Sequence, residues 1–308
     1  MRGILVVNHS ATATTPRVRD VLVHALADEV DLDIVTTDHR GHAAELGRRA
    51  REERMDVVVT LGGDGTINEV VNGLLEHGPG PDVPMIATVP GGSANVFPRA
   101  LGLPADPVEA TGELLDGLRE KRTRTLGLGR ANGRWFTVNA GLGLDAEIVA
   151  AMERQRGEGR AATPGRYFAT TLREFFVATD RRTPALRVVR PGLEPVEGVF
   201  LAIVQNTSPW TYLGRKAVDP CPLASFDTGL DLFAVRRLGV ATSLRTARRM
   251  LARSTAGSTR KSLTVLHDQP EFTVESDRPV AFQVDGEGLG EIQRVTFRAV
   301  PEALRAVV

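Results

Sequence analysis

The segment LGGDGTINEVVNGLL, residues 61–75, places three glycines around Asp64. A short apolar run precedes it, and apolar residues at helical spacing follow it, with Thr66 where an N-cap would lie. Glycines at a strand-to-helix turn let backbone N–H groups approach a ligand, and the helix N-terminus behind them attracts negative charge. The pattern predicts a phosphate site, although an ordinary turn in which Asp64 only caps the helix would explain the same residues.

This loop is one of four at the end of predicted strands. Apolar runs at 4–7, 32–35, 56–61 and 84–89 alternate with helical patterns, and this rhythm predicts a parallel sheet covered by helices. Such sheets bind ligands at the carboxyl ends of their strands. The loops that begin there are NHSAT, TTDHRGH, GGDGT and PGGSAN, and each is rich in Gly, Ser, Thr or Asn. Together they favour a phosphate or nucleotide site.

Three histidines, His9, His39 and His42, lie in or near these loops. Their spacing indicates no metal site, and they are equally well explained as polar loop residues or as catalytic residues. The first helical pattern has Val18, Val21, Leu22, Ala25 and Leu26 on one face, which we expect to be buried.

The rhythm changes near residue 123. A hairpin turn is predicted at 131–133, and two helical patterns follow, around 144–154 and 166–178. A series of strand-like runs comes next, so the second half is expected to be mainly antiparallel β. The Gly-rich stretch 157–166 is a candidate mobile loop, and a plain surface connection is the commoner explanation.

The composition narrows the class of protein. The chain has 308 residues with 38 basic and 38 acidic side chains, which argues against binding nucleic acid through bulk charge. One cysteine, Cys221, cannot form an internal disulfide, so a cytoplasmic protein is the natural inference.

No apolar run reaches the length of a membrane span, and any contact with the inner membrane surface would be peripheral. The basic helical segment 242–253 could rest on anionic head groups, but a solvated helix face is the commoner case. A homodimer is left open.

Four segments together resemble the diacylglycerol kinase and sphingosine kinase catalytic family, bacterial soluble lipid kinases included. In chain order they are GGDGTINEV (62–70), PGGSANVFPRALGLP (90–104), NAGLGLDAE (139–147) and FQVDGEG (282–288). The GGDGT motif is shared with NAD kinases and, more loosely, phosphofructokinases, whereas the last two segments separate the lipid kinases from them. There is no P-loop motif and no protein-kinase motif set.

The resemblance implies an N-terminal α/β domain with a parallel sheet, of the NAD kinase and phosphofructokinase type, and a C-terminal antiparallel β-sandwich. We expect domain boundaries at 1–125 and 126–295, with the tail 296–308 returning to the first domain. ATP and Mg²⁺ are the implied cofactors, and a lipid alcohol is the implied substrate. The nucleotide contacts of the family fall on Asn8, Thr37, Gly62, Gly63, Asp64, Gly65, Thr66, Asn68, Gly92 and Ser93.

An alcohol is a poor nucleophile while it holds its proton, so the acceptor needs a base or an oriented carboxylate. The family gives that role to the acids of the DGE turn, which are Asp285 and Glu287 in this chain, and Asp64 is a third catalytic candidate. Asp285-Gly286 also has the composition of a plain hairpin turn. Which of the two acids is the base stays open.

Three positions depart from the family pattern. Val96 and Gly127 stand where relatives carry acids, and Thr228 replaces an acid of a structural Mg²⁺ site. Asp227 and Asp231 remain nearby as doubtful metal ligands, because a neutral Thr should weaken such a site. These losses keep open a lipid- or nucleotide-binding protein without activity, and the shared GGDG loop keeps open a small-molecule kinase of the NAD kinase type.

Overall fold

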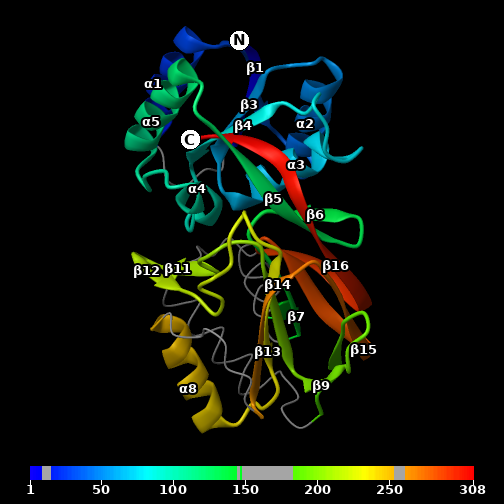
Figure 1. Cartoon of the computed structure of the whole chain (residues 1–308). Helices are drawn as coiled ribbons and strands as arrows, with labels where there is room; N and C mark the ends of the chain where they lie inside the picture. Colours follow the sequence, from blue (N-terminus) through cyan, green and yellow to red (C-terminus); the bar gives the residue numbers. More distant parts are fainter. Residues whose placement is uncertain (9–14, 144–145, 148–182, 253–260) are drawn as a thin grey trace. The chain divides into compact units, whose positions relative to one another are not determined.

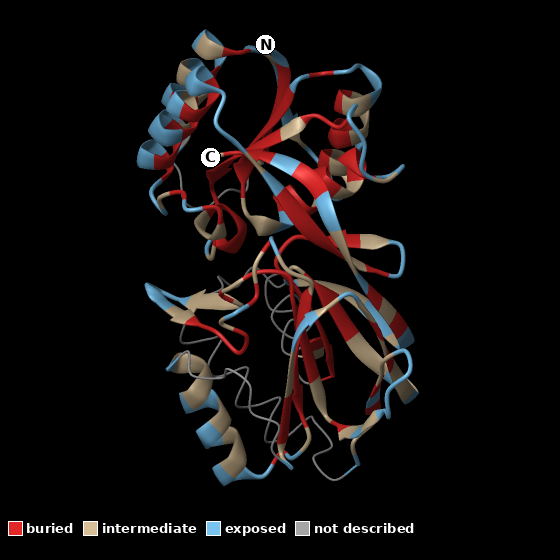
Figure 2. Ribbon diagram, in the orientation of Figure 1, coloured by how far each residue is buried: buried red, intermediate tan, exposed pale blue. Residues whose placement is uncertain are grey.

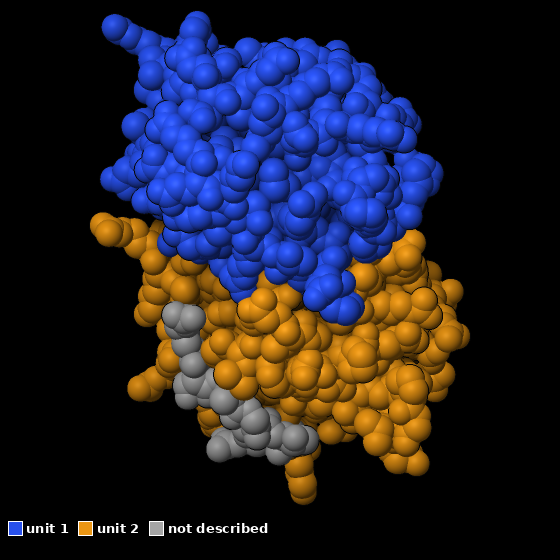
Figure 3. Space-filling view, turned by 45° about the horizontal axis from the view of Figure 1, so that its top comes forward, with its two compact units in different colours: residues 1–128, 301–308 blue, residues 129–300 orange. Residues whose placement is uncertain are grey.

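The computed structural model describes residues 1–8, 15–143, 146–147, 183–252 and 261–308. These residues fall into two compact units, 1–128 with 301–308 and 129–300 (Figure 3). Residues 9–12 of the NHSAT loop, the helical pattern around 144–154 apart from residues 146–147, the helical pattern around 166–178 and the loop at 157–166 lie outside the described residues.

The first unit is built on a parallel sheet, as the alternating pattern predicts. Its strands are β1 (Arg2–Asn8), β2 (Asp31–Thr37), β3 (Val57–Gly62) and β4 (Met85–Pro90). They lie in the order β4-β3-β1-β2, and every neighbouring pair is parallel. All residues of β3 are buried (Figure 2), because a central strand covered on both faces must be apolar throughout. At the chain's end, Ala306 pairs in parallel register with Ile86 of β4.

Helices cover both faces of this sheet. They are α1 (Pro16–Glu29), α2 (His42–Glu52), α3 (Asp64–Leu74), α4 (Val96–Ala100) and α5 (Pro107–Glu120). The pair α1 and α5 lies on one face, and the pair α2 and α3 lies on the other (Figure 1). The hydroxyl of Thr15 caps α1, and the carboxylate of Asp106 caps α5.

The buried face of α1 is narrower than its apolar pattern predicts. Leu22 and Leu26 are buried, but Val21 is 63% exposed, so its assignment to the buried face is wrong. Val21 lies one position before Leu22 and so is turned about 100° away from it around the helix axis. A stripe centred on Leu22 and Leu26 therefore leaves Val21 facing water.

Two glycines let α2 and α3 pack with their backbones close together. A Cβ on Gly73 would lie 2.0 Å from the carbonyl oxygen of Ala44, and a Cβ on Gly47 would lie 2.5 Å from that of Val70. No side chain fits at either position unless the helices move apart. This packing fixes the loops that precede both helices.

The second unit is antiparallel, as expected from the change of rhythm near residue 123. Its strands are β5 (Thr123–Ala131), which begins in the first unit, β6 (Arg134–Phe136), β7 (Asn139–Gly143), β8 (Leu186–Val189), β9 (Val196–Val199), β10 (Leu201–Gln205), β11 (Thr211–Leu213), β12 (Lys216–Val218), β13 (Leu230–Val235), β14 (Leu263–Gln269), β15 (Glu271–Val284) and β16 (Glu287–Val307). The main ladder runs β14-β13-β10-β7-β15-β16. Ala131 pairs with Arg134, which confirms the predicted hairpin turn between β5 and β6.

Aromatic packing anchors the long β15–β16 hairpin. The ring of Phe297 on β16 lies 5.4 Å from that of Phe272 on β15 and meets Phe136 of β6 edge to face at 6.2 Å. All three rings are fully buried, so they supply much of the apolar area in this core.

The helix α8 (Val240–Leu251) has no buried residue, and Leu244 on it is 69% exposed. Within the described part of the chain, every helix is too short or too polar to cross a membrane.

The close contact of α2 and α3 can be tested with Gly73→Ala. The added methyl group meets backbone atoms, and overpacking of this kind costs about 1–3 kcal/mol. We expect the urea midpoint of unfolding to fall. Gly112→Ala is the matched control, because Gly112 lies exposed on α5 with nothing within 4 Å of an added Cβ. That variant should be about 0.5–1 kcal/mol more stable than the parent. Equal midpoints for the two variants would contradict this packing.

Candidate active site

The loops after β3 and β4 touch each other through glycines. The amide of Gly91 donates to the carbonyl oxygen of Gly62 at 2.7 Å. A Cβ on Gly92 would lie only 2.7 Å from the Cα of Gly63. Side chains are therefore excluded where the two loops cross, so only backbone atoms lie at this point of the sheet edge.

Asp64 joins these two loops through its carboxylate. One oxygen accepts the N–H of Val96 at 3.0 Å, and the other accepts the N–H of Phe97 at 2.9 Å. Both amides belong to the first turn of α4, where backbone donors have no partner within the helix. The simplest reading of the sequence is that Asp64 only caps its own helix, α3. The structure gives its carboxylate another role. It satisfies the N-terminus of the next helix, 32 residues further along the chain.

The prediction that Thr66 is an N-cap is wrong. Helix α3 begins at Asp64 with Gly63 as its N-cap, so Thr66 lies inside the first turn and is buried. Its side chain folds back over Gly62, where a Cβ would lie 2.8 Å from the Thr66 hydroxyl. That hydroxyl accepts a hydrogen bond from the amide of Asn8 at 2.9 Å, which ties β1 to the glycine loop.

Asn95 shapes the second glycine loop, and the sequence reasoning missed it. Its side-chain oxygen accepts the N–H of Gly92 at 2.8 Å, and its NH₂ donates to the Gly92 carbonyl oxygen at 2.8 Å. Its backbone is left-handed, with φ of 48°. Asn adopts this conformation more readily than most residues. An Asn just after a run of small residues and before an apolar helix is the signal that could have revealed it.

The other predicted nucleotide residues lie along the same edge of the first unit. Asn8 and Thr37 end neighbouring strands and pair in register. Gly65 and Ser93 are exposed, and a Cβ on Gly65 would meet nothing within 4 Å. Asn68 differs, because it is buried in α3 and its side-chain oxygen accepts from Asn72 at 3.1 Å. Asn68 therefore stabilises the helix behind the loop.

In the second unit, Asp285 lies in a two-residue hairpin turn. Val284 pairs with Glu287, and Asp285 and Gly286 both have positive φ, 47° and 80°. The turn reading of Asp285-Gly286 is therefore correct, but the side chain does more. Its carboxylate accepts four hydrogen bonds between 2.8 and 2.9 Å. The donors are the backbone N–H groups of Thr137, Val138 and Asn139 and the hydroxyl of Thr137.

The surroundings of Asp285 act on its pKa in two directions. Removal from water raises the pKa above its ordinary value, and the hydrogen bonds from Thr137, Asn139 and Val138 oppose this rise. The rise prevails. A proton on this carboxylate would nevertheless have to displace one of four well-placed donors, so its lone pairs are poorly available to a substrate.

Glu287 is held differently. It begins β16, its side chain is 18% exposed, and its carboxylate forms an ion pair with Arg134 at 2.5 Å. Arg134 follows the β5–β6 turn and was not among the predicted site residues. A lone Arg after a turn carries no sequence signal for such a role. The pair places a positive charge beside a carboxylate that keeps access to solvent.

The two predicted ligands of a structural metal have different environments. Asp231 is buried, and one of its oxygens lies 2.7 Å from Nδ1 of His267 and accepts the N–H of Asp268 at 3.0 Å. Burial raises the pKa of Asp231. Asp227 is exposed, and its carboxylate accepts from the hydroxyl of Ser225 at 3.3 Å. An imidazole beside Asp231 and a hydroxyl that donates to the exposed Asp227 do not match the oxygen cage that Mg²⁺ prefers.

The carboxylate network around Asp285 can be tested by Asp285→Asn. The amide turns an N–H₂ group toward a backbone donor, so a buried hydrogen bond is lost at a cost of about 1–3 kcal/mol. Glu287→Gln changes only a partly exposed ion pair and should cost about 0–1 kcal/mol. Urea unfolding of the two variants measures the difference. A Glu287→Gln variant as unstable as Asp285→Asn would contradict this assignment.

A structural Mg²⁺ at Asp227 and Asp231 is also testable. We expect millimolar Mg²⁺ without nucleotide to leave the Tm unchanged, because Thr228 supplies no charge and Asp231 is already bonded. Thermal unfolding with and without Mg²⁺ checks this. A rise in Tm that disappears in Asp231→Asn would show that the site binds the metal after all.

Part of the chain is similar to proteins of a known family. Residues 2–131 match the model of the diacylglycerol kinase catalytic domain. A diacylglycerol kinase of Staphylococcus carnosus is 35% identical over 129 residues, which is 42% of this chain and 40% of the relative. One from Staphylococcus aureus strain Newman is 35% identical over 117 residues, 38% of this chain and 35% of the relative. The chain thus matches about two fifths of the length of these curated relatives.

Solved structures extend the likeness of the fold beyond this segment. The crystal structure of a diacylglycerol kinase from Bacillus anthracis strain Sterne covers 99% of this chain and 96% of its own, with a TM-score of 0.73 and 19% identity. Another structure from the same organism reaches a TM-score of 0.78 at 21% identity. At such identities the likeness shows the fold alone. Together with the segment match, it confirms the family resemblance that the motifs carry: residues 2–131 are similar to the diacylglycerol kinase catalytic domain.

Proposed function

We propose that this protein is an ATP-dependent kinase that transfers the γ-phosphoryl group to the hydroxyl of a diacylglycerol-like or related lipid alcohol. The observation that carries the proposal is the match of residues 2–131 to a diacylglycerol kinase catalytic domain, with all four ligand loops of the parallel sheet inside the matched segment. Phosphoryl transfer needs mainly positioning and charge neutralisation, which such loops can supply.

The nucleotide would bind at the carboxyl ends of β1 to β4. The crossing of Gly63 and Gly92 leaves room for a ligand to approach the backbone without meeting a side chain at these two glycines, and helix α3 begins directly after Gly63. Both features attract phosphate oxygens. The hydroxyl of Ser93 is exposed at the same loop and is a further donor.

The donor set fits a Mg²⁺ carried by the nucleotide rather than one held by a protein cage. Mg²⁺ in such sites takes one or two carboxylates and several phosphate oxygens and waters. Asp64 is the carboxylate at this loop, and each of its oxygens has lone-pair capacity beyond one backbone hydrogen bond. The ion would neutralise the charge of the phosphates. Val96 in place of a second acid leaves Asp64 as the ligand on which this role depends.

Glu287 is our candidate for the base that accepts the proton of the lipid hydroxyl. Its carboxylate is partly exposed and paired with Arg134, whereas the carboxylate of Asp285 accepts four hydrogen bonds from the protein. Asp285 is better suited to position the turn that carries Glu287. Arg134 would orient the Glu287 carboxylate.

A binding protein without activity is the alternative from another class. It is favoured by Val96, Gly127 and Thr228, which remove acids that relatives carry. Turnover separates the two readings, because a protein without activity would bind ATP and lipid without transfer.

The test of the kinase is transfer of radiolabelled phosphate from ATP to a panel of lipid alcohols in vesicles and in detergent. Glu287→Gln keeps the shape of the side chain and removes the base, so kcat should fall by about 10²–10⁴ with little change in ATP affinity. Asp64→Asn should abolish transfer. Glu291→Gln is the matched control, because Glu291 is an exposed carboxylate on the same strand, and it should keep parental kcat.

Three outcomes decide among the readings. Transfer by the parent with loss in Glu287→Gln supports the mechanism as stated. Unchanged kcat in Glu287→Gln with loss in a folded Asp285→Asn would make Asp285 the base. ATP binding by the parent without turnover on any lipid alcohol would favour the binding protein.

A further inference from the structure

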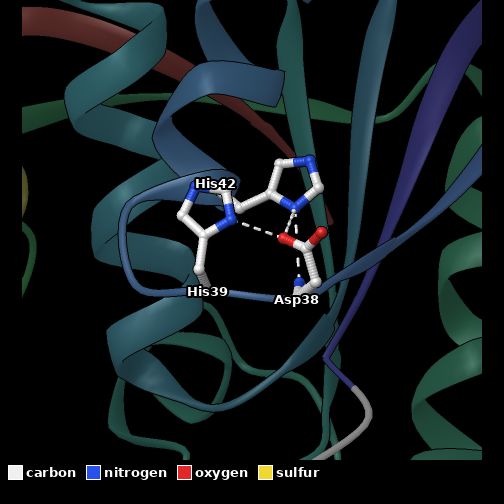
Figure 4. A group of neighbouring side chains, drawn as sticks. All are labelled: Asp38, His39 and His42. Carbon is white, nitrogen blue, oxygen red and sulfur yellow. Dashed lines mark hydrogen bonds and ion pairs between the residues drawn. The ribbon is translucent and has the colours of Figure 1, made fainter.

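Two side chains on the loop between β2 and α2, those of Asp38 and His39, converge with that of His42, the first residue of α2 (Figure 4). Nδ1 of His39 lies 2.5 Å from one carboxylate oxygen of Asp38, and Nδ1 of His42 lies 2.7 Å from the same oxygen. The two imidazole rings are stacked, with centroids 4.9 Å apart and planes inclined by 9°. Nδ1 of each ring thus contacts the same carboxylate oxygen, and Nδ1 of His42 also accepts the backbone N–H of Asp38 at 3.3 Å, a bond that a metal ion at this nitrogen would replace.

The fold holds this loop in place. Strand β2 ends at Thr37 and helix α2 begins at His42, so only four residues connect them. Gly41 has φ of 91°, a left-handed conformation that favours glycine, and its N–H donates to the carboxylate of Glu69 on α3 at 3.1 Å. The side chain of His42 is 18% exposed, which limits its freedom. The convergence therefore comes from an ordered turn.

The three possible ligand atoms, two imidazole nitrogens and one carboxylate oxygen, are of the kind that bind a d-block cation. Neutral imidazole nitrogens with a carboxylate suit Zn²⁺, Cu²⁺ or Ni²⁺, whereas Mg²⁺ prefers oxygen ligands alone. In the structure the ligand atoms of the three side chains all lie within 4.8 Å of one another. Zn–N and Zn–O bonds are about 2.0–2.2 Å long, so a small opening of the cluster would admit the ion.

A second carboxylate supports one of the imidazoles from behind. Nε2 of His39, the nitrogen turned away from Asp38, lies 3.4 Å from the carboxylate of Glu45. A His that binds a metal through one nitrogen usually donates the other N–H to such a group, which sets its tautomer and orientation. With Nδ1 of His39 as the ligand, its Nε2–H would point to Glu45.

We propose that Asp38, His39 and His42 form a binding site for a divalent d-block cation of the Zn²⁺ class, with a fourth position open to water or a ligand. Three protein ligands with an open position are the arrangement of accessible zinc sites. This site is separate from the Mg²⁺ that would accompany ATP, and it does not depend on the proposed kinase activity. A plain polar cluster, in which Asp38 only accepts hydrogen bonds from the histidines, is the reading that the test must exclude.

The test is calorimetric titration of the metal-free protein with Zn²⁺, without nucleotide or lipid. We expect one equivalent to bind at this site, and His39→Asn and His42→Asn each to weaken binding by about 100-fold or more. Glu45→Gln should weaken it by about 10-fold, because it removes the partner of His39. His24→Asn is the matched control, since His24 is an exposed histidine of the same unit on α1, and it should bind as the parent does.

His267→Asn is a second control, because His267 also lies beside a carboxylate, that of Asp231. Circular dichroism checks that each variant is folded. If the less exposed His42 cannot be replaced without unfolding, Zn²⁺ binding by the His39→Asn variant still tests the site, because His39 is more exposed. Absence of Zn²⁺ binding by the parent, or equal binding in a folded His39→Asn variant, would overturn the site. Displacement of Zn²⁺ by equimolar Mg²⁺ would overturn the assignment to a d-block cation.

Discussion

The carboxylate of Asp64 accepts two backbone N–H groups from α4, and the ligand edge of the first unit depends on this interaction. It joins the loop after β3 to the loop after β4 at the point where Gly63 and Gly92 leave no room for side chains. A neutral amide could not serve both donors, because one of its two polar groups is itself a donor. A negative charge at the first turn of α4 is also favourable to the helix dipole.

This arrangement gives one residue two compatible duties. A carboxylate oxygen has more than one lone pair, so Asp64 can hold α4 and still face a cation. The hydrogen bonds of Asn95 to Gly92 and of Asn8 to Thr66 lock the surrounding loops. Rigid loops lose little entropy when a phosphate binds, because their conformation is already set. Asn95, which is not among the proposed nucleotide contacts, would therefore still contribute to binding by holding the loop in place.

In the second unit, too, a carboxylate accepts backbone N–H groups, but there it fixes a hairpin turn. Asp285 receives three successive backbone amides and a hydroxyl, which pins the β15–β16 turn against the segment before β7. Glu287 follows it on a strand whose aromatic side chains are buried in the core. In our proposal the carboxylate of Asp285, which accepts four hydrogen bonds, positions the turn, and Glu287, which is paired with Arg134, accepts the proton of the substrate.

The sequence by itself determined the strands, the helices and the loops that carry chemistry, because each depends on local periodicity and on glycine at tight turns. The parallel first part, the antiparallel second part and the hairpin turn at Asn132 were all readable in this way. What only the tertiary structure decided are the partners of the polar side chains. Asp64 bonds to amides 32 and 33 residues away, and Asp285 to donors about 146–148 residues away. The cluster of Asp38, His39 and His42 is local in sequence, but it needs the left-handed Gly41 and the anchor of Glu69 to converge. Periodicity records which face of an element is apolar, whereas a hydrogen bond between distant residues exists only once packing has placed both groups, and so neither its partner nor its role can be read from spacing.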